Sequence, residues 1–311
     1  MGKDILTLDC YVKSALDFLE EDLAFSLELP KSRHTLVVGS QNGYYAGRML
    51  YRFAGRSFSH AEETLAQFEI DTKKSLFEDV TIVSATGSRN VASIASYALD
   101  AGLKVNLITC RKGSETELES DKVRIIFVPS IEEPATVNIS TYGKMIQGIT
   151  HEVPKEIRDF ITSMQRPKDG YDKFCALTMI FPDSMLEVSR MVHWKLNGEN
   201  IGRQTGTLST NLTNFMHGGA VTDAEKELYV LVGLSPKELE TAMGVLQNVP
   251  EKRKLCIEPP GHPGPLIYLL AGYTIVGEFQ KGYPAFQKNI EDYGKRMHDW
   301  HWISPVAETP K

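Results

Sequence analysis

The stretch from residue 79 to residue 110, DVTIVSATGSRNVASIASYALDAGLKVNLITC, decides the expected fold of this chain. It opens at 80–83 with an apolar run rich in β-branched residues, which is typical of a strand buried on both faces. Apolar residues then recur at helical spacing from Val91 to Ala98, Gly102 follows as a helix end, and 105–108 is a second apolar run. This order predicts one strand–helix–strand unit of a parallel sheet.

A turn rich in hydroxyl groups joins the first of these strands to the helix. It reads Ser84-Ala85-Thr86-Gly87-Ser88. A strand-to-helix turn of this kind offers backbone N–H groups, the positive end of a helix dipole and three hydroxyls, which suits a phosphate. Serine and threonine are also ordinary N-cap residues, so the residues alone leave a purely structural role equally open.

The same alternation of strands and helices extends outward in both directions. Before and after the central unit we expect a leading amphipathic helix at 9–29, strands at 34–38 and 123–128, and a helix at 139–149. Further on, we expect strands at 174–181, near 201–205, at 228–232 and at 254–257, and helices at 183–197, 208–217, 236–247 and from Pro265 onward. The pattern predicts an α/β protein with two tandem doubly wound parallel-sheet domains, at 1–152 and 172–311, separated by a polar connector at 153–171.

Composition narrows the class of protein. Of the 311 residues 42% are hydrophobic and 24% are charged, as in ordinary globular proteins, and no apolar run approaches the roughly 20 residues of a membrane span. The formal net charge of −6 and the lack of a basic block disfavour a nucleic-acid partner, and the first residues predict a cytoplasmic location rather than secretion. The four cysteines are scattered without the spacing of a metal site.

A glycine-containing loop, GSQNGYYAG, follows the expected strand at 34–38. Its glycines stand four residues apart, which does not match the dinucleotide fingerprint and disfavours a nicotinamide oxidoreductase. The strand–turn–helix form nevertheless indicates a ligand-facing loop at the carboxyl edge of a parallel sheet. Gly39, Gln41 and Asn42 are therefore candidate substrate-binding residues.

In the order of its motifs, the chain over residues 30–302 resembles tandem SIS-domain proteins, the sugar isomerase family. The family's phosphate loop reads S-x-S/T-G-x-T between a strand and a helix. Ser84, Thr86 and Gly87 match this pattern, Ser88 lies beside them, and Arg89 takes the place of the usual threonine. In the family's first loop, G-x-G-x-S, Gly39 matches while Gln41 and Gly43 replace the second glycine and the serine.

Three further segments carry the resemblance. EEPATVNISTYGKM is similar to the acidic turn and Ser/Thr helix start that close over the sugar, with Glu133, Ser140 and Thr141 as matches. NFMHGGA resembles an H-G-P signature in which His217 is the histidine, and Glu199 is the nearest candidate for the family's catalytic glutamate. The closing YGKRMHDWHW is similar to the tail of fructoselysine-6-phosphate-type deglycases.

The resemblance implies an enzyme that acts on a sugar phosphate or on its adduct with an amine. Glu199 would be the base and His217 the acid of proton transfer through an enediol or enaminol, without a metal or redox cofactor. Ser84, Thr86, Gly87, Ser88 and Arg89 would bind phosphate. Isomerase and deglycase share the first step and stay alternatives, as does a non-catalytic sugar-phosphate sensor.

The resemblance also implies a homodimer, or a dimer of dimers, with the active site near the subunit interface. An apolar helix in the last part of the chain points the same way, because it offers a surface too hydrophobic to face water. The residues expected on that surface are Leu266, Leu269, Leu270, Tyr273 and Ile275.

Overall fold

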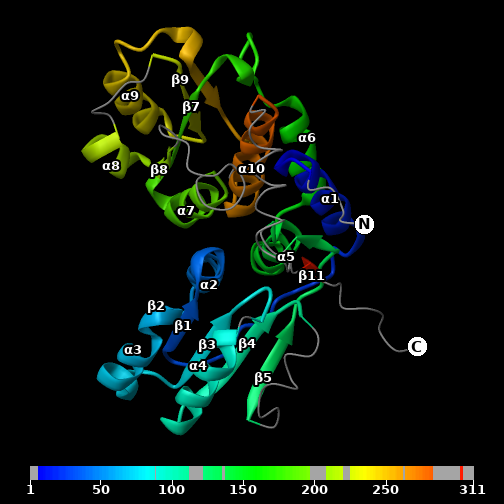
Figure 1. Cartoon of the computed structure of the whole chain (residues 1–311), viewed down its shortest axis with the longest axis vertical. Coiled ribbons are helices and arrows are strands. Elements are labelled where there is room, and N and C mark those ends of the chain that lie inside the picture. Colours follow the sequence, from blue (N-terminus) through cyan, green and yellow to red (C-terminus); the bar gives the residue numbers. More distant parts are fainter. Residues whose placement is uncertain are drawn as a thin grey trace, which may run out of the picture. The chain divides into compact units, whose positions relative to one another are not determined.

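The computed structural model describes residues 6–87, 89–111, 122–134, 137–196, 208–219, 225–261, 263–282 and 302–303. The chain divides into two compact units, each built on its own parallel sheet (Figure 1). The five-stranded unit comprises Asp17–His151 and His301–Lys311, and the four-stranded unit comprises Met1–Leu16 and Glu152–Trp300. No helix in these described ranges is long and apolar enough to cross a membrane.

The sheet of the five-stranded unit has the order β2-β1-β3-β4-β5, and every neighbouring pair is parallel. Buried apolar residues on β1, β3 and β4 form its core, as a sheet covered on both faces requires. The strands are β1 (Thr35–Gly39), β2 (Phe58–Glu62), β3 (Asp79–Val83), β4 (Lys104–Thr109) and β5 (Val123–Phe127). A short antiparallel pair, β6 (Glu133–Pro134) with β11 (Trp302–Ile303), completes the strands described in this unit.

Helices cover the two faces of this sheet. On one face α2 (Gln41–Phe53) contacts α5 (Ile139–Thr150), and on the other α3 (Ala66–Lys73) contacts α4 (Arg89–Asp100). The second pair closes a core cluster over the β1, β3 and β4 side chains. The helices that follow β1 and β3 thus leave toward opposite faces.

The four-stranded unit repeats the arrangement with the order β10-β9-β7-β8, again entirely parallel. Its strands are β7 (Ala176–Phe181), β8 (Leu208–Asn211), β9 (Glu227–Val232) and β10 (Lys254–Ile257). Its helices are α6 (Pro154–Ser163), α7 (Leu186–Trp194), α8 (Leu212–Asn214), α9 (Pro236–Val245) and α10 (Pro265–Lys281). Two parallel sheets with alternating helices confirm the predicted α/β class.

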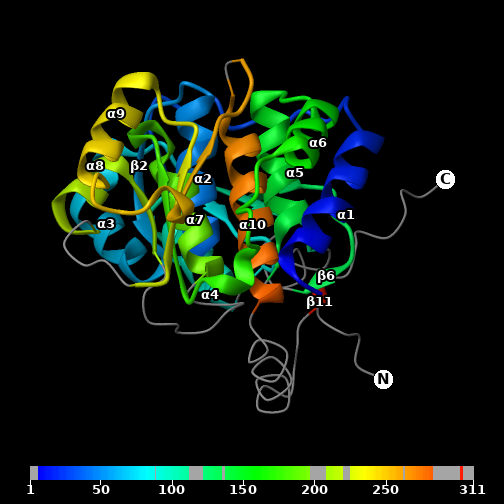
Figure 2. The same ribbon diagram turned by 90° about the horizontal axis from the view of Figure 1, so that it is seen from above.

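Helix α10 is apolar because it is buried, and it contacts both α6 and α7 (Figure 2). This burial corrects the expectation that its apolar face is an exposed dimer surface. The five residues named for that surface, Leu266, Leu269, Leu270, Tyr273 and Ile275, are all buried within the chain. A homodimer stays a prediction that must rest on other grounds.

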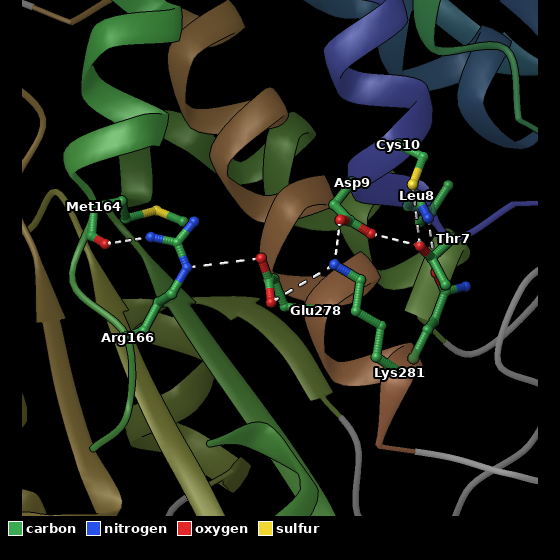
Figure 3. Close-up of polar contacts among 9 residues, drawn as sticks. Thr7, Leu8, Asp9, Cys10, Met164, Arg166, Glu278 and Lys281 are labelled. Atoms are coloured by element: carbon green, nitrogen blue, oxygen red, sulfur yellow. Dashed lines mark hydrogen bonds and ion pairs between the residues drawn. The ribbon is translucent and has the colours of Figure 1, made fainter. Parts of the chain in front are cut away.

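Helix α1 (Leu8–Glu21) begins in the four-stranded unit, where polar contacts tie its first turn to the end of α10 (Figure 3). The backbone N–H of Leu8 donates to Oε1 of Gln280 at 2.8 Å, and Lys281 pairs with Asp9. At Gly277 an added Cβ would lie 2.1 Å from the backbone nitrogen of Asp9, so the two segments meet closely.

The leading helix ends at Glu21, well before the predicted residue 29. In the five-stranded unit, two side chains of α5 bond carbonyl groups in the last turn of α1 and just after it. Gln147 Nε2 donates to the Leu19 carbonyl at 3.3 Å, and Lys144 Nζ donates to that of Asp22. The chain then runs on without helix toward β1.

In the second half the connector expected at 153–171 contains helix α6, and part of one expected helix is a strand. Residues 208–211, expected within a helix, form strand β8 beside β7. The buried residues of this strand are polar, Ser209, Thr210 and Asn211, so the apolar signal of a strand is missing. Hydrogen bonds stabilise them instead; Ser209 Oγ donates to the Ser189 carbonyl at 2.9 Å. The strand expected near 201–205 lies outside the described residues.

Candidate functional site

The strand order of the five-stranded unit marks one position on its carboxyl edge. In open parallel sheets of order 2-1-3-4-5, ligands bind where the connections after neighbouring strands leave toward opposite faces. Here that position lies between β1 and β3, whose last residues Gly39 and Val83 are register partners. The loop before α2 and the turn at 84–87 therefore meet at this edge, which we call the β1/β3 switch point.

Glycines bring the start of α2 close to β3. A Cβ added at Gly43 would lie 2.5 Å from the Val83 carbonyl oxygen, and one at Gly47 would lie 2.7 Å from Cγ1 of Val37. At Gly39 the added atom would approach the carbonyl carbon of Gly43 to 2.6 Å. The four-residue spacing of these glycines thus serves close helix–strand packing, which explains why it differs from the dinucleotide fingerprint.

Asn42, in the first turn of α2, is only 4% exposed. Neither its side-chain oxygen nor its side-chain nitrogen has a hydrogen-bond partner. A buried amide without partners costs free energy, and in native proteins it calls for a specific explanation such as a ligand. Its neighbour Gln41 is exposed and has a φ of 47°, a strained conformation for a side chain of this kind.

The turn after β3 presents Ser84 and Gly87 as buried residues and Thr86 as a half-buried one. Gly87 has a φ of 58°, which favours glycine at this position. Residue 88 lies outside the described part of the chain; Arg89 begins α4, but its side chain is not among the described ones. The structure therefore brings Ser84, Thr86 and Gly87 to the switch point with Gly39, Gln41 and Asn42.

The end of β4 fastens this turn. Thr109 Oγ1 and Cys110 Sγ donate to the Ala85 carbonyl at 3.2 and 3.0 Å, and Arg111 Nη1 donates to the Thr86 carbonyl at 3.2 Å. Burial raises the pKa of the Cys110 thiol, which keeps it protonated and able to donate. From the sequence, Cys110 was considered as one of four cysteines without metal-site spacing, and none of these three contacts was predicted. The sequence signal that could have revealed these residues is their position at the carboxyl end of β4, the strand beside β3.

Glu133 and Ser140, predicted to contact substrate, bond each other at the start of α5. The Glu133 carboxylate is 1% exposed and accepts from the Ser140 hydroxyl at 2.6 Å. It also accepts from the backbone N–H groups of Ile139 and Ser140 at 3.1 and 3.0 Å. Thr141 Oγ1 donates to Cys110 Sγ at 3.4 Å. In this arrangement Glu133 caps a helix, and Thr141 links that helix to the residues behind the 84–87 turn.

The structure describes only one of the two candidate catalytic residues. Glu199 lies outside the described residues. His217 belongs to the four-stranded unit, on a five-residue π-helix (Phe215–Gly219) that directly follows α8, and it is exposed. π-Helical turns occur frequently at functional sites, so the backbone around His217 is unusual in a way the sequence pattern did not predict.

The fold is shared with solved structures of proteins that act on sugar phosphates. Tagatose-6-phosphate ketose/aldose isomerase from Escherichia coli superposes with a TM-score of 0.58 at 13% identity, over 88% of each chain. Glucosamine-6-phosphate deaminase from Thermotoga maritima gives 0.57 at 12% identity, over 88% of this chain and 92% of the other.

The C-terminal domain of glucosamine-fructose-6-phosphate aminotransferase from Francisella tularensis gives a TM-score of 0.52 at 11% identity, over 91% of this chain and 93% of that one. At such low identities the likeness concerns the fold. No protein-family model and no curated protein sequence matches the chain.

Proposed function

We propose that this chain is a cytoplasmic enzyme that binds a sugar phosphate, or its adduct with an amine, at the β1/β3 switch point and processes it by proton transfer. The proteins that share its fold carry names that specify sugar-phosphate substrates, and this agrees with the motif order along the chain. The reaction is an aldose–ketose isomerisation or the removal of an amine from a phosphorylated sugar.

The observation that carries the proposal is the polar make-up of the switch point. Ser84 and Thr86 stand in a strand-to-helix turn, and the Asn42 amide is buried without a partner beside it in the fold. Hydroxyl groups, backbone N–H groups and helix starts favour a phosphate. An amide that both donates and accepts suits sugar hydroxyls or phosphate oxygens.

Phosphate binding would make the chemistry efficient by fixing the position of the reacting carbon. In the proposed step, Glu199 removes the proton from the carbon next to the carbonyl or imine, and the electron pair forms an enediol or enaminol. His217 delivers a proton to the oxygen or to the leaving amine. In isomerisation a proton returns to the neighbouring carbon and the carbonyl ends on the other carbon. In deglycation the enaminol takes up the proton to become an imine, water adds to the imine carbon, and the C–N bond breaks to release the amine and leave a carbonyl.

A mass-spectrometric screen of phosphorylated ketoses, aldoses and their amine adducts tests the activity directly. In deuterium oxide, turnover should place deuterium on the carbon next to the carbonyl. Glu199→Gln should lower this exchange and turnover by at least about 10²-fold, because general acid–base groups typically contribute this much. His217→Ala should impair turnover while retaining more of the exchange. Near wild-type turnover in Glu199→Gln would reject this residue as the base.

A sugar-phosphate sensor without catalysis is the second candidate, and the role of Glu133 favours it. This carboxylate, at the same edge of the sheet, is occupied in capping α5. Binding of sugar phosphates without any deuterium exchange or product, under conditions in which Glu199→Gln binds equally well, would select the sensor.

A further inference from the structure

Three carbonyl groups of the 84–87 turn, those of residues 85–87, are held from one side by the last residue of β4 and the two residues that follow it. The Ala85 oxygen accepts from Thr109 Oγ1 at 3.2 Å, from Cys110 Sγ at 3.0 Å and from the Cys110 backbone N–H at 3.4 Å. The Thr86 and Gly87 oxygens both accept from Nη1 of Arg111, at 3.2 and 3.5 Å.

The direction of a carbonyl group also fixes the direction of the N–H group in the same peptide unit. A trans peptide unit is planar, and its C=O and N–H point in opposite directions. Since the Ala85 carbonyl faces Thr109 and Cys110, the N–H of Thr86 points away from the end of β4. An N–H turned outward in this way can contribute to a concavity that binds anions.

The position of Arg111 allows its side chain to hold the carbonyl groups of the turn in this orientation. Its backbone N–H donates to Thr109 Oγ1 at 3.2 Å, which fixes the start of its side chain beside the turn. One guanidinium nitrogen carries two N–H groups and can serve two carbonyls at once. The Thr109 hydroxyl is buried and links the strand end to the turn, whereas the guanidinium reaches the turn from an exposed position.

We propose that Arg111 is a positioning residue that presets the 84–87 turn for an anion by holding its carbonyl groups on the side of β4. Thr109 acts in the same way on the Ala85 carbonyl. The turn then meets a phosphate with the Thr86 N–H already directed outward, while the Gly87 N–H donates to the Ser84 carbonyl at 3.4 Å and stabilises the turn itself. This inference rests on the proposed sugar-phosphate site and assigns its preorganisation to residues outside the loop itself.

The test follows inorganic phosphate binding by nuclear magnetic resonance, with the backbone amide signal of Thr86 as the readout. Arg111→Met should weaken phosphate binding about tenfold, because the turn is no longer held in the binding conformation before the anion arrives. It should also reduce the change in the Thr86 amide signal at saturating phosphate. Thr109→Val keeps the shape and the net charge but removes one donor, so it should change the Thr86 response in the same direction.

Arg124→Met is the matched control, because it removes the same charge from β5 of the same unit and should leave both readouts unchanged. Thermal unfolding midpoints close to wild type establish that the variants fold. An Arg111→Met protein with a wild-type Thr86 response at saturation, or a neutral outcome for both variants, overturns the positioning role. If wild-type protein binds neither phosphate nor sugar phosphates, the proposed function itself fails.

Discussion

The two units share the same strand order, but the polar groups at their switch points differ. Both orders put the first strand between the second and third, as β2-β1-β3 and as β8-β7-β9. In the five-stranded unit the loops at that position keep the buried Asn42 amide without a partner. In the four-stranded unit carboxylates that follow β7 and β9 accept hydrogen bonds, although the buried Oδ1 of Asn211 at the end of β8 has no partner.

In the four-stranded unit the side chains of Asp183 and Glu238 accept these hydrogen bonds. Asp183 accepts from Asn211 Nδ2 at 2.5 Å and from the backbone N–H and hydroxyl of Thr213 at 2.9 and 2.6 Å. Ser235 and Glu238 form a reciprocal capping box at the start of α9. These carboxylates occupy the N–H groups that a phosphate would need and would also repel it.

An aromatic ring closes the same position. A Cβ added at Gly233 would lie 2.2 Å from the Tyr268 ring, and the Tyr268 hydroxyl donates to the Gly233 carbonyl at 3.1 Å. Strand order thus provides a place for a ligand, while the side chains that follow the strands decide which polar groups there remain available to it.

The largest effect should come from the glycine that seats α2 on β3. Gly43→Ala places a Cβ 2.5 Å from a backbone oxygen, so α2 must shift, and we expect a loss of about 1–3 kcal/mol in unfolding free energy together with loss of phosphate binding. Gly244→Ala on α9 meets nothing within 4 Å and should be neutral or stabilise by about 0.5 kcal/mol. Denaturant unfolding of the two variants measures the difference.

Two asparagines should respond in opposite directions. Asn42→Leu removes a buried amide without partners, so the unfolding free energy should rise by about 1 kcal/mol while affinity for sugar phosphate falls. Asn211→Leu removes the donor to Asp183 and should cost about 1–2 kcal/mol without changing ligand affinity. Destabilisation by Asn42→Leu with unchanged affinity would contradict the role of Asn42 in binding.

Removing one hydroxyl group from each unit, at Thr86 and at Ser235, should affect ligand binding in the first case and stability in the second. Thr86→Ala should weaken binding of phosphorylated sugars about tenfold and barely move the unfolding midpoint. Ser235→Ala breaks the capping box, so it should cost about 1 kcal/mol of stability and leave affinity unchanged. Calorimetric titration and thermal unfolding of both variants give the four values needed.

The smallest effect concerns pH. Burial raises the pKa of Asp183, but the hydrogen bonds from Thr213 and Asn211 outweigh it, so this pKa lies below its ordinary value. Because the pKa of this carboxyl is lower in the folded protein, its ionised form stabilises the fold above the pKa of the unfolded chain, which is about 4. This contribution is lost as the pH falls through the folded pKa. Wild type should therefore lose more stability than Asp183→Asn between pH 5 and about pH 2. Parallel pH profiles of the two proteins would exclude this contribution.

The sequence predicts an element well where burial of apolar side chains shapes it. The run at 80–83, the helical spacing from Val91 and the run at 105–108 correspond to β3, α4 and β4. Strand β2 escaped prediction because only Ala61 of its five residues is buried, and β8 did so because its buried residues are polar.

The candidate site was predictable only in part. Ser84, Thr86 and Asn42 were recognisable from the loops that follow two strands. The lack of a partner for Asn42 depends on how α2 packs on β3, which no local pattern reveals. Arg111 acts on carbonyl groups 24 and 25 residues earlier in the chain, and such contacts carry no periodic signal.

The most direct test of the account is a calorimetric titration of the wild-type protein with matched phosphorylated and unphosphorylated sugars. We predict one site per chain that requires the phosphate group, because the β1/β3 switch point keeps a buried amide without a partner, whereas carboxylates and Tyr268 occupy the switch point of the four-stranded unit. Equal affinity for a sugar with and without its phosphate, or two equivalent phosphate-dependent sites per chain, would contradict it.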